Sequence, residues 1–355
     1  MSIEQLLRLA VERGASDLHL RAGAPPILRI DGALVSLDQG APRLIAADIR
    51  QALSELTTES LEQRFAAAKE LDFPYSLEGV GRFRVNASIQ RGTVALAFRR
   101  IGLTIPTIEQ LHLPPICGSL ALKQRGLVLV TGPAGSGKST TLAAMIEHLN
   151  QQEARVVVTI EDPIEYLYQD KRSVITQREV GADTLSFAAA LRGALRQDVD
   201  VILVGEMRDP ETMAACLTAA ETGHLVLSTL HTKSAPLSID RIVDVFPPHQ
   251  QPQIRMQLSL TLEGALAQTL LPRLDQPGRI PAVEVMLANP AVRSLIREGK
   301  SHQLPNAIQT AAAEGMRTME QALAELVRQG LLAVEEAWGA ANSPEALRSL
   351  LGGGA

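Results

Sequence analysis

Cysteine, aromatic residues and long apolar runs are all scarce in this sequence. Among its 355 residues only Cys117 and Cys216 are cysteines. Two thiols are too few for a four-cysteine zinc site or a disulfide framework, so we expect a reducing, cytoplasmic setting and a metal that arrives with its ligand. Because aromatic residues make up 3% of the chain, stacking platforms for single-stranded nucleic acid would have very few rings.

A surplus of positive charge is missing as well. Lys and Arg total 34 against 39 Asp and Glu, a formal net charge of −5, which is the wrong sign for a broad nucleic-acid-binding face. Apolar runs such as residues 126–130 are far shorter than the roughly 18 residues that span a bilayer. Charged residues such as Glu4 and Arg8 interrupt the N-terminus. We therefore expect no nucleic-acid partner, no signal peptide and no direct membrane insertion.

The chain is longer than one typical domain of about 100–150 residues, and we predict two. Residues 1–101 read as a small mixed α/β domain that opens with an amphipathic helix ending at Gly14. The dipeptide Asp31-Gly32 favours a type I′ hairpin. Phe83, Val85, Ala87 and Ile89 alternate with polar residues, which predicts a strand with one buried face. The strands predicted in this domain cover residues 26–30, 33–37, 82–89 and 93–101.

Residues 102–118 are rich in proline and glycine, and we predict a linker there. Beyond it, residues 119–355 alternate apolar β-type runs with helical patterns, as in a parallel sheet covered on both faces. The predicted strands are 127–130, 156–160, 201–204 and 225–227, and the predicted helices are 140–149, 187–195 and 212–221. Residues 250–271 and 316–331 also read as helical, so we expect a helical C-terminal part from about residue 250.

Residues 132–139 read G-P-A-G-S-G-K-S, the full P-loop pattern, directly after a predicted strand and before a predicted helix. Glycines let backbone N–H groups close around phosphate oxygens, and the helix N-terminus adds positive potential. A nucleoside triphosphate, with ATP as the expected ligand, and Mg²⁺ follow from the pattern. The predicted nucleotide-binding residues are Gly132, Pro133, Ala134, Gly135, Ser136, Gly137, Lys138, Ser139 and Thr140.

Within this loop each polar residue has an expected task. Lys138 would reach the β- and γ-phosphates, Ser139 would ligate Mg²⁺, and Thr140 would steady the loop. Hydrolysis also needs carboxylates at the ends of neighbouring strands. We expect Glu165 to polarise the attacking water and Glu206 to act at the metal, directly or through water. The alternative for the three acids in residues 161–165 is a solvated acidic loop.

His224 and His231 bracket the predicted strand 225–227. A histidine at a strand end is often a structural group with satisfied hydrogen bonds. Beside a nucleotide site, however, the pair would sense the γ-phosphate through a hydrogen bond. We keep both readings open.

Six further segments stand out beside the P-loop. They read A-S-D-L-H-L (15–20), R-F-R-V-N (82–86), T-I-E-D-P-I-E (159–165), V-I-L-V-G-E-M-R-D (201–209), T-G-H-L-V-L-S-T-L-H-T (222–232) and A-V-R-S-L-I-R-E (291–298). Together they resemble, over nearly the whole chain, the PilT family of type IV pilus retraction ATPases within the wider secretion ATPase superfamily. The last segment is similar to the family's A-I-R-N-L-I-R-E, with Val292 and Ser294 as departures.

The resemblance implies a PAS-like α/β domain in residues 1–101 and a RecA-like P-loop ATPase domain in residues 119–355. It also implies a homohexameric ring in which arginines reach the phosphates when the cleft between domains closes. Arg84, Arg99 and Arg125 match such positions, with Arg82 a weaker match. Arginine pairs with phosphate bidentately and stabilises charge that develops in the transition state.

The function implied is a cytoplasmic motor that couples ATP hydrolysis to pilus retraction and twitching motility. It would lie at the inner membrane beside the pilus base and a platform protein, with a paralogous retraction ATPase as a further candidate partner. Alternatives are a pilus extension or type II secretion ATPase, an accessory retraction ATPase with little turnover of its own, and a nucleic-acid translocase. The first normally carries an added N-terminal domain and a four-cysteine zinc element, and the sequence shows neither.

Overall fold

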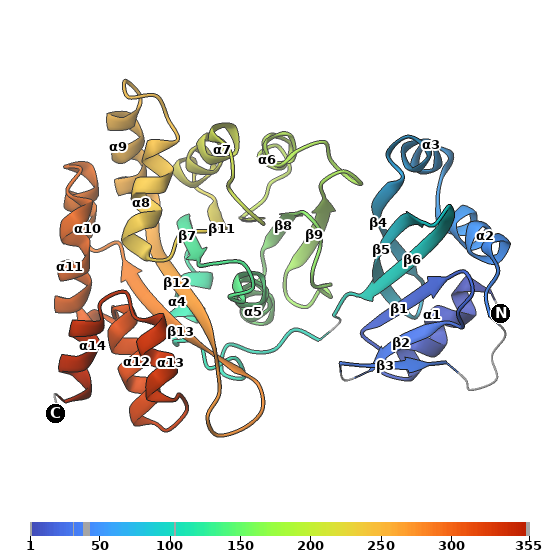
Figure 1. The fold of residues 1–355 in the computed structure, drawn as a ribbon. Coiled ribbons are helices and arrows are strands. Elements are labelled where there is room, and N and C mark those ends of the chain that lie inside the picture. The colour runs from blue at the N-terminus through green and yellow to red at the C-terminus, as the bar shows by residue number, and fades with distance from the viewer. Residues whose placement is uncertain (1, 31, 38–42, 103, 353–355) are drawn as a thin grey trace. The chain divides into compact units, whose positions relative to one another are not determined.

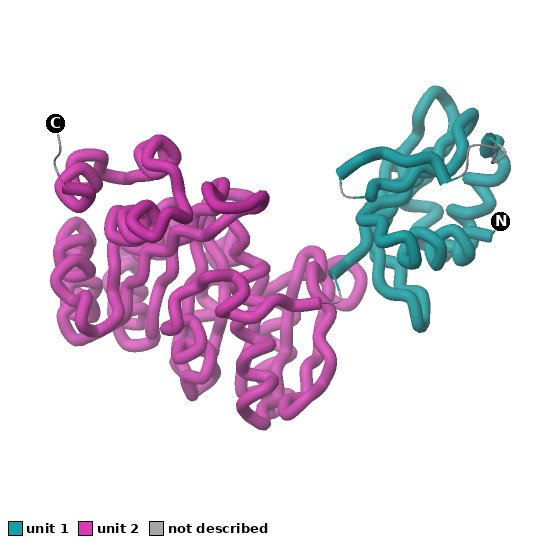
Figure 2. The backbone as a smooth tube through the Cα atoms, turned by 90° about the horizontal axis from the view of Figure 1, so that it is seen from below, with its two compact units in different colours: residues 1–103 teal, residues 104–355 magenta. Residues whose placement is uncertain are grey.

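The computed structural model describes residues 2–30, 32–37, 43–102 and 104–352, and the chain divides into two compact units (Figures 1 and 2). The first unit comprises residues 1–103 and the second residues 104–355. Residues 102–118, which we expected to form a linker, are largely part of the second unit. Ile108, Leu113 and Cys117 are buried in its core. The described part of the chain contains no helix long and apolar enough to cross a bilayer.

The first unit is an antiparallel sheet packed against helices, in agreement with the α/β domain predicted. Its strands lie in the order β3-β2-β1-β6-β5-β4. The strands are β1 (Asp17–Arg21), β2 (Ile27–Ile30), β3 (Ala33–Ser36), β4 (Glu70–Leu77), β5 (Gly81–Gln90) and β6 (Thr93–Arg100), and the helices are α1 (Ile3–Glu12), α2 (Ala46–Leu56) and α3 (Glu59–Ala68). A capping box between Ser2 and Gln5 begins α1.

Two details of the first unit refine the sequence predictions. Ile30 pairs with Ala33 across the predicted two-residue turn, in which Gly32 has φ +84° and Asp31 lies outside the described residues. In β5, Phe83, Val85 and Ala87 are buried as expected, but Ile89 is 41% exposed. The prediction for Ile89 was wrong because the residue lies at the strand's end, where the core no longer covers it.

The second unit is built on a seven-stranded sheet in the order β13-β12-β7-β11-β10-β8-β9. Neighbouring strands run parallel except β12 and β13, which are antiparallel. The strands are β7 (Gly126–Thr131), β8 (Val156–Glu161), β9 (Val174–Glu179), β10 (Val201–Val204), β11 (Leu225–Leu230), β12 (Leu262–Pro272) and β13 (Arg279–Leu287). Figure 1 shows helices on both faces of this sheet.

Alternate residues of the central strands enter two separate cores, which explains their continuous apolar runs. Leu127 and Leu129 of β7 pack with α6 (Phe187–Ala194), α7 (Pro210–Glu221), α8 (Ala235–Asp244) and α9 (Gln251–Thr261). Val128 and Val130 pack on the other side with α4 (Ile116–Ala121) and α5 (Lys138–Gln152). The parallel sheet covered on both faces is thereby confirmed.

The helix predicted over residues 250–271 was wrong in its second half. Helix α9 ends at Thr261, and β12 follows it between β7 and β13. The run 262–271 shows no regular alternation of apolar and polar residues because the strand is largely buried on both faces, so its pattern does not distinguish strand from helix. The predicted start of the helical C-terminal part, at about residue 250, was also wrong, because β12 and β13 lie between α9 and the helices that follow. Those helices are α10 (Pro290–Arg297), α11 (Leu304–Thr310), α12 (Met319–Arg328), α13 (Val334–Ala340) and α14 (Pro344–Leu351), with short 3₁₀ turns at 301–303 and 312–314.

Candidate nucleotide-binding site

The P-loop joins the fully buried strand β7 to helix α5. Gly137 precedes the helix with φ +87°, and Gly132 has φ +145°. A Cβ atom on Gly132 would lie 2.2 Å from the backbone oxygen of Gln268, so only glycine fits at this position. The amide of Gly132 donates to Leu230 O at 3.3 Å, which ties the start of the loop to β11.

Lys138 is folded onto the loop that carries it. Its ammonium donates to the carbonyl oxygens of Gly132 and Pro133, both at 3.0 Å. Burial lowers the pKa of Lys138, although the nearby carboxylates of Glu206 and Glu165 act in the opposite direction. A partly desolvated cation held between carboxylates gains strongly from an anion with several charges.

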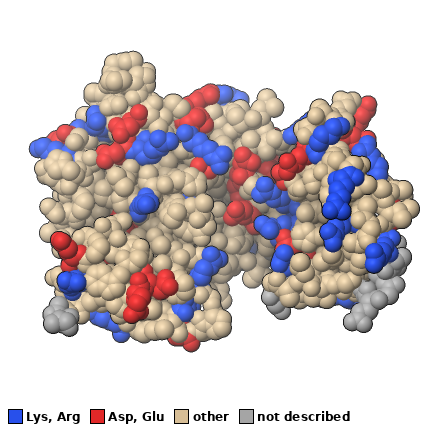
Figure 3. Space-filling model, in the orientation of Figure 1, with Lys and Arg blue, Asp and Glu red and all other residues tan. Residues whose placement is uncertain are grey.

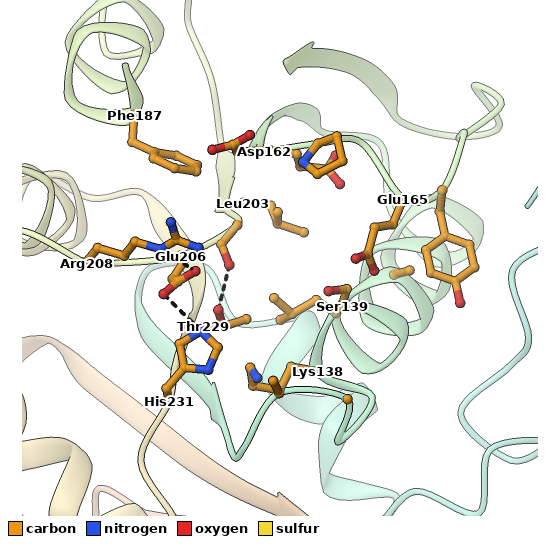
Figure 4. A pocket seen from close by; sticks show the side chains of 18 of the residues that line it. Lys138, Ser139, Asp162, Glu165, Phe187, Leu203, Glu206, Arg208, Thr229 and His231 are labelled. Atoms are coloured by element: carbon orange, nitrogen blue, oxygen red, sulfur yellow. Dashed lines mark hydrogen bonds and ion pairs between the residues drawn. The ribbon is translucent and has the colours of Figure 1, made fainter. Parts of the chain in front are cut away.

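A cavity of about 270 Å³ opens beside the loop, at the carboxyl ends of the parallel strands (Figure 4). This edge is where ligands bind in open α/β sheets. Its polar lining includes Lys138, Ser139, Glu161, Asp162, Glu165, Tyr166, Glu206, Arg208, Thr229 and His231. Figure 4 shows Glu165 pointing into the cavity near Ser139, on the side opposite Glu206.

Glu206 is fixed by two basic side chains. Its Oε2 lies 2.8 Å from Arg208 Nε, and its Oε1 lies 2.9 Å from His231 Nε2. Burial alone would raise the pKa of Glu206, but Arg208 and His231 outweigh that effect and hold the pKa below its ordinary value. Glu206 is therefore an ionised carboxylate at neutral pH.

A second carboxylate, Glu161, closes the end of β8. It accepts hydrogen bonds from Thr159 Oγ1 at 2.7 Å and from Gln177 Nε2 at 3.3 Å. Burial raises the pKa of Glu161, and the proximity of Glu165 adds to the rise. The site thus places carboxylates, hydroxyls and a lysine around one cavity. Among the described residues no cluster of three or more His, Cys, Asp or Glu side chains that would hold a metal occurs.

His224 does not reach this cavity. It precedes β11, whereas His231 follows that strand, so the two histidines lie at opposite ends of β11. His224 Nδ1 lies 3.0 Å from Ala219 O and 3.3 Å from Thr222 Oγ1. Of these two histidines, His231 is the one that lines the cavity. Arg125 likewise precedes β7, so it lies at the end of that strand opposite the P-loop.

Arg84 and Arg99 belong to the first unit, where they are direct cross-strand partners on β5 and β6. Arg84 Nε lies 3.7 Å from Asp72 Oδ1, and Arg99 Nε lies 2.9 Å from Asp17 Oδ1. About half of the Arg84 side chain and three quarters of the Arg99 side chain are exposed. Figure 3 shows several basic side chains on one face of the first unit.

The sequence patterns did not identify three residues of the site region as candidate site residues. Arg208 belongs to the G-E-M-R-D segment, and its place two residues after Glu206 was the available signal. Tyr166 directly follows Glu165, and its hydroxyl lies 2.9 Å from Thr140 Oγ1. Gln268 contacts the P-loop from β12, and the wrong helix prediction concealed it.

The P-loop, the parallel sheet and the acids at its edge define the second unit as a P-loop ATPase domain. Residues 115–279 match the family model "Type II/IV secretion system protein". The type IV pilus retraction ATPase PilT of Pseudomonas aeruginosa is 46% identical over 345 residues, 97% of this chain and 99% of that protein. The type IV pilus ATPase PilU of the same organism is 43% identical, over 99% of this chain and 91% of that protein.

A solved structure of the pilus retraction motor PilT with bound ADP superposes with a TM-score of 0.91. Its sequence is 46% identical, and the match covers 98% of this chain and 99% of that one. Both units of the present chain are therefore included in the similarity. The chain belongs to the PilT family of type IV pilus retraction ATPases, and it is an ATP hydrolase.

Proposed function

We propose that this protein is a hexameric cytoplasmic motor that couples ATP hydrolysis to type IV pilus retraction. The observation that carries the proposal is the convergence of Lys138, Glu165, Glu206 and His231 on one cavity. It occurs in a chain that is similar to a retraction ATPase over 97% of its length. Pilus disassembly and twitching motility would be the output.

ATP would bind with its phosphates in the P-loop. Lys138 would exchange the carbonyls of Gly132 and Pro133 for the β- and γ-phosphates. The hydroxyl of Ser139 and the carboxylate of Glu206 fit Mg²⁺, which prefers oxygen ligands and takes few from the protein when phosphates and water supply the rest. When bound, Mg²⁺ would neutralise charge on the phosphates.

Glu165 and Glu206 would divide the work of hydrolysis. Glu165 would orient the water that attacks the γ-phosphorus and accept its proton while the bond to the bridging oxygen breaks. Glu206 would hold the metal in place, directly or through water. His231, through its contact with Glu206, would report the state of the γ-phosphate to the end of β11.

The arginines support an arrangement in a ring. Arg125 lies at the amino-terminal end of β7, remote from its own P-loop, so it would reach phosphate only in another subunit. The exposed pair Arg84 and Arg99 would approach a phosphate when domains close around the nucleotide. Hydrolysis around a homohexamer would then move first units against second units and act on a membrane platform protein at the pilus base.

The direct test is deletion of the gene, followed by complementation with the wild type or with Lys138→Ala. A retraction motor predicts cells with many surface pili and no twitching, restored by the wild type alone. Cells without pili would instead indicate an extension ATPase. Sedimentation of the purified protein with Mg²⁺ and nucleotide tests the hexamer separately from the direction of movement.

A second candidate is an accessory retraction ATPase, because the chain is similar over nearly its whole length to two pilus ATPases of one organism, at 46% identity to PilT and 43% identity to PilU. An accessory ATPase and a main motor differ in what each can do alone in the cell. A main motor hydrolyses ATP and supports twitching when it is the only retraction ATPase in the cell. An accessory one supports twitching only when a paralogue is present.

A further inference from the structure

Gln268 on β12 joins the P-loop to the first turn of helix α5. Its Nε2 donates to the carbonyl oxygen of Ser136 at 2.6 Å, and its Oε1 accepts from Thr141 Oγ1 at 2.7 Å. Gln268 and Ser136 are each 3% exposed, and Thr141 is 1% exposed. More than 120 residues of chain separate the strand from the loop, so this bridge is a tertiary contact.

The register of the sheet explains why this side chain reaches the loop. Ala267 of β12 pairs with Thr131, the last residue of β7, so Gln268 lies beside the point where the P-loop begins. Alternation places Gln268 on the same face of the sheet as Leu266. Leu266 packs in the core cluster that contains Leu142 and Met145 of α5. Gln268 therefore faces the helix that the P-loop starts.

The approach of Gln268 also restricts two of the loop glycines. A Cβ atom on Gly132 would lie 2.2 Å from Gln268 O, and one on Gly137 would lie 2.9 Å from Gln268 Nε2. Both glycines have positive φ. The loop therefore packs against both the side chain and the backbone of Gln268.

We propose that Gln268 is a positioning residue that holds the P-loop in its phosphate-binding shape. It does not line the cavity, so it acts through the loop. In a planar trans peptide the C=O and N–H point in opposite directions. Because Ser136 O is held against Gln268, the N–H of Gly137 points away from β12. In that direction it can donate to a phosphate. This inference rests on the proposed nucleotide site.

The decisive measurement is the Kd for Mg²⁺·ADP, with kcat and KM for ATP on the same variants. Gln268→Met keeps the volume and removes both hydrogen bonds. We expect Kd to rise about ten- to a hundredfold, because a buried carbonyl loses its donor and the peptide can turn. KM should rise with it, while kcat at saturation should fall less, since bound phosphates restore the loop.

Two variants of Thr141 test the bridge from its other end. Thr141→Val removes the hydroxyl without changing the shape and should raise Kd in the same direction. Thr141→Ser retains the hydroxyl and should bind Mg²⁺·ADP within about twofold of the wild type. Because one bridge is shared, the double variant Gln268→Met/Thr141→Val should lose less than the product of the two single effects.

Controls separate this role from general stability and from the site itself. Thr269→Val changes the next residue of β12, which faces the other side of the sheet, and should leave Kd unchanged. A folded Gln268→Met protein with the Kd of the wild type would overturn the proposal, as would multiplicative effects of Gln268→Met and Thr141→Val. If Gln268→Met does not fold, equal Kd values for Thr141→Val and Thr141→Ser would overturn it. Unchanged binding by Lys138→Ala would refute the nucleotide site instead.

Discussion

Glu206 and His231 stand at the carboxyl ends of two adjacent parallel strands, β10 and β11, with 2.9 Å between Oε1 and Nε2. A further hydrogen bond at 2.6 Å, from Thr229 Oγ1 to Gly205 O, joins the same two strand ends. A shift of the Glu206 carboxylate toward a ligand would therefore act on the segment that follows β11. The contact links the proposed metal position to the chain that leads into α8.

The two histidines provide a matched pair of variants. His231→Ala should lower kcat about tenfold or more, because Glu206 loses one of the two groups that orient it. His224→Ala should change kcat by less than about twofold, because His224 lies at the opposite edge of the sheet. Steady-state ATPase assays on both variants test this. Equal losses would show that His224 acts at a site of another subunit.

Lys138→Ala should abolish measurable hydrolysis and weaken nucleotide binding, since the β- and γ-phosphates lose their cation. Titration with Mg²⁺·ADP and an ATPase assay measure the two effects. Lys123→Ala is a suitable control, because Lys123 pairs with Glu263 at 3.0 Å and does not line the cavity. Steady-state hydrolysis by Lys138→Ala at the rate of the wild type would refute the assignment.

Glu165→Gln and Glu206→Gln should bind nucleotide nearly as well as the wild type and turn over slower by orders of magnitude. The amide keeps the size of the side chain but cannot accept the proton of water or hold a metal as a carboxylate does. Single-turnover assays under saturating ATP isolate the chemical step. If affinity fell as much as turnover, the two residues would be ligands of the ground state.

Arg84→Ala should lower ATPase activity only under conditions in which rings form. Arg84 lies on the first unit with about half of its side chain exposed. In the proposed ring it would reach the bound nucleotide when the domains close around it. Activity should be followed against protein concentration, beside sedimentation. An activity loss of the same size in rings and in monomers would contradict a role that depends on assembly.

The sequence predicted the parts of the site that lie close together in the chain. Strand, P-loop and helix are contiguous, and the acids follow apolar runs whose carboxyl ends meet at one edge of a parallel sheet. His224 does not reach the cavity of its own chain, since flanking a strand does not specify which end of that strand faces the ligand. Gln268 was missed because its role depends on the register between β12 and β7, which no local pattern in residues 262–271 encodes.

A buried carboxylate in the second unit gives a prediction that does not depend on nucleotide. Glu284 on β13 is 5% exposed and accepts a hydrogen bond from the amide of Ala235, at the start of α8, at 2.6 Å. Burial raises its pKa to about 7, the negative charge of Glu320 acts in the same direction, and hydrogen bonds from the amides of Ala235 and Met319 oppose the rise.

Because the pKa of Glu284 is higher in the folded chain than in the unfolded one, the folded state keeps a proton that the unfolded state releases. Stability should therefore fall as pH rises from about 4.5 to 7 and level off above, by on the order of 3 kcal/mol. Glu284→Gln should remove this slope. Trp338, the single tryptophan, packs in the cluster that contains Ala282 and Met319, so its fluorescence reports denaturant unfolding there. Parallel pH profiles for variant and wild type would contradict the prediction.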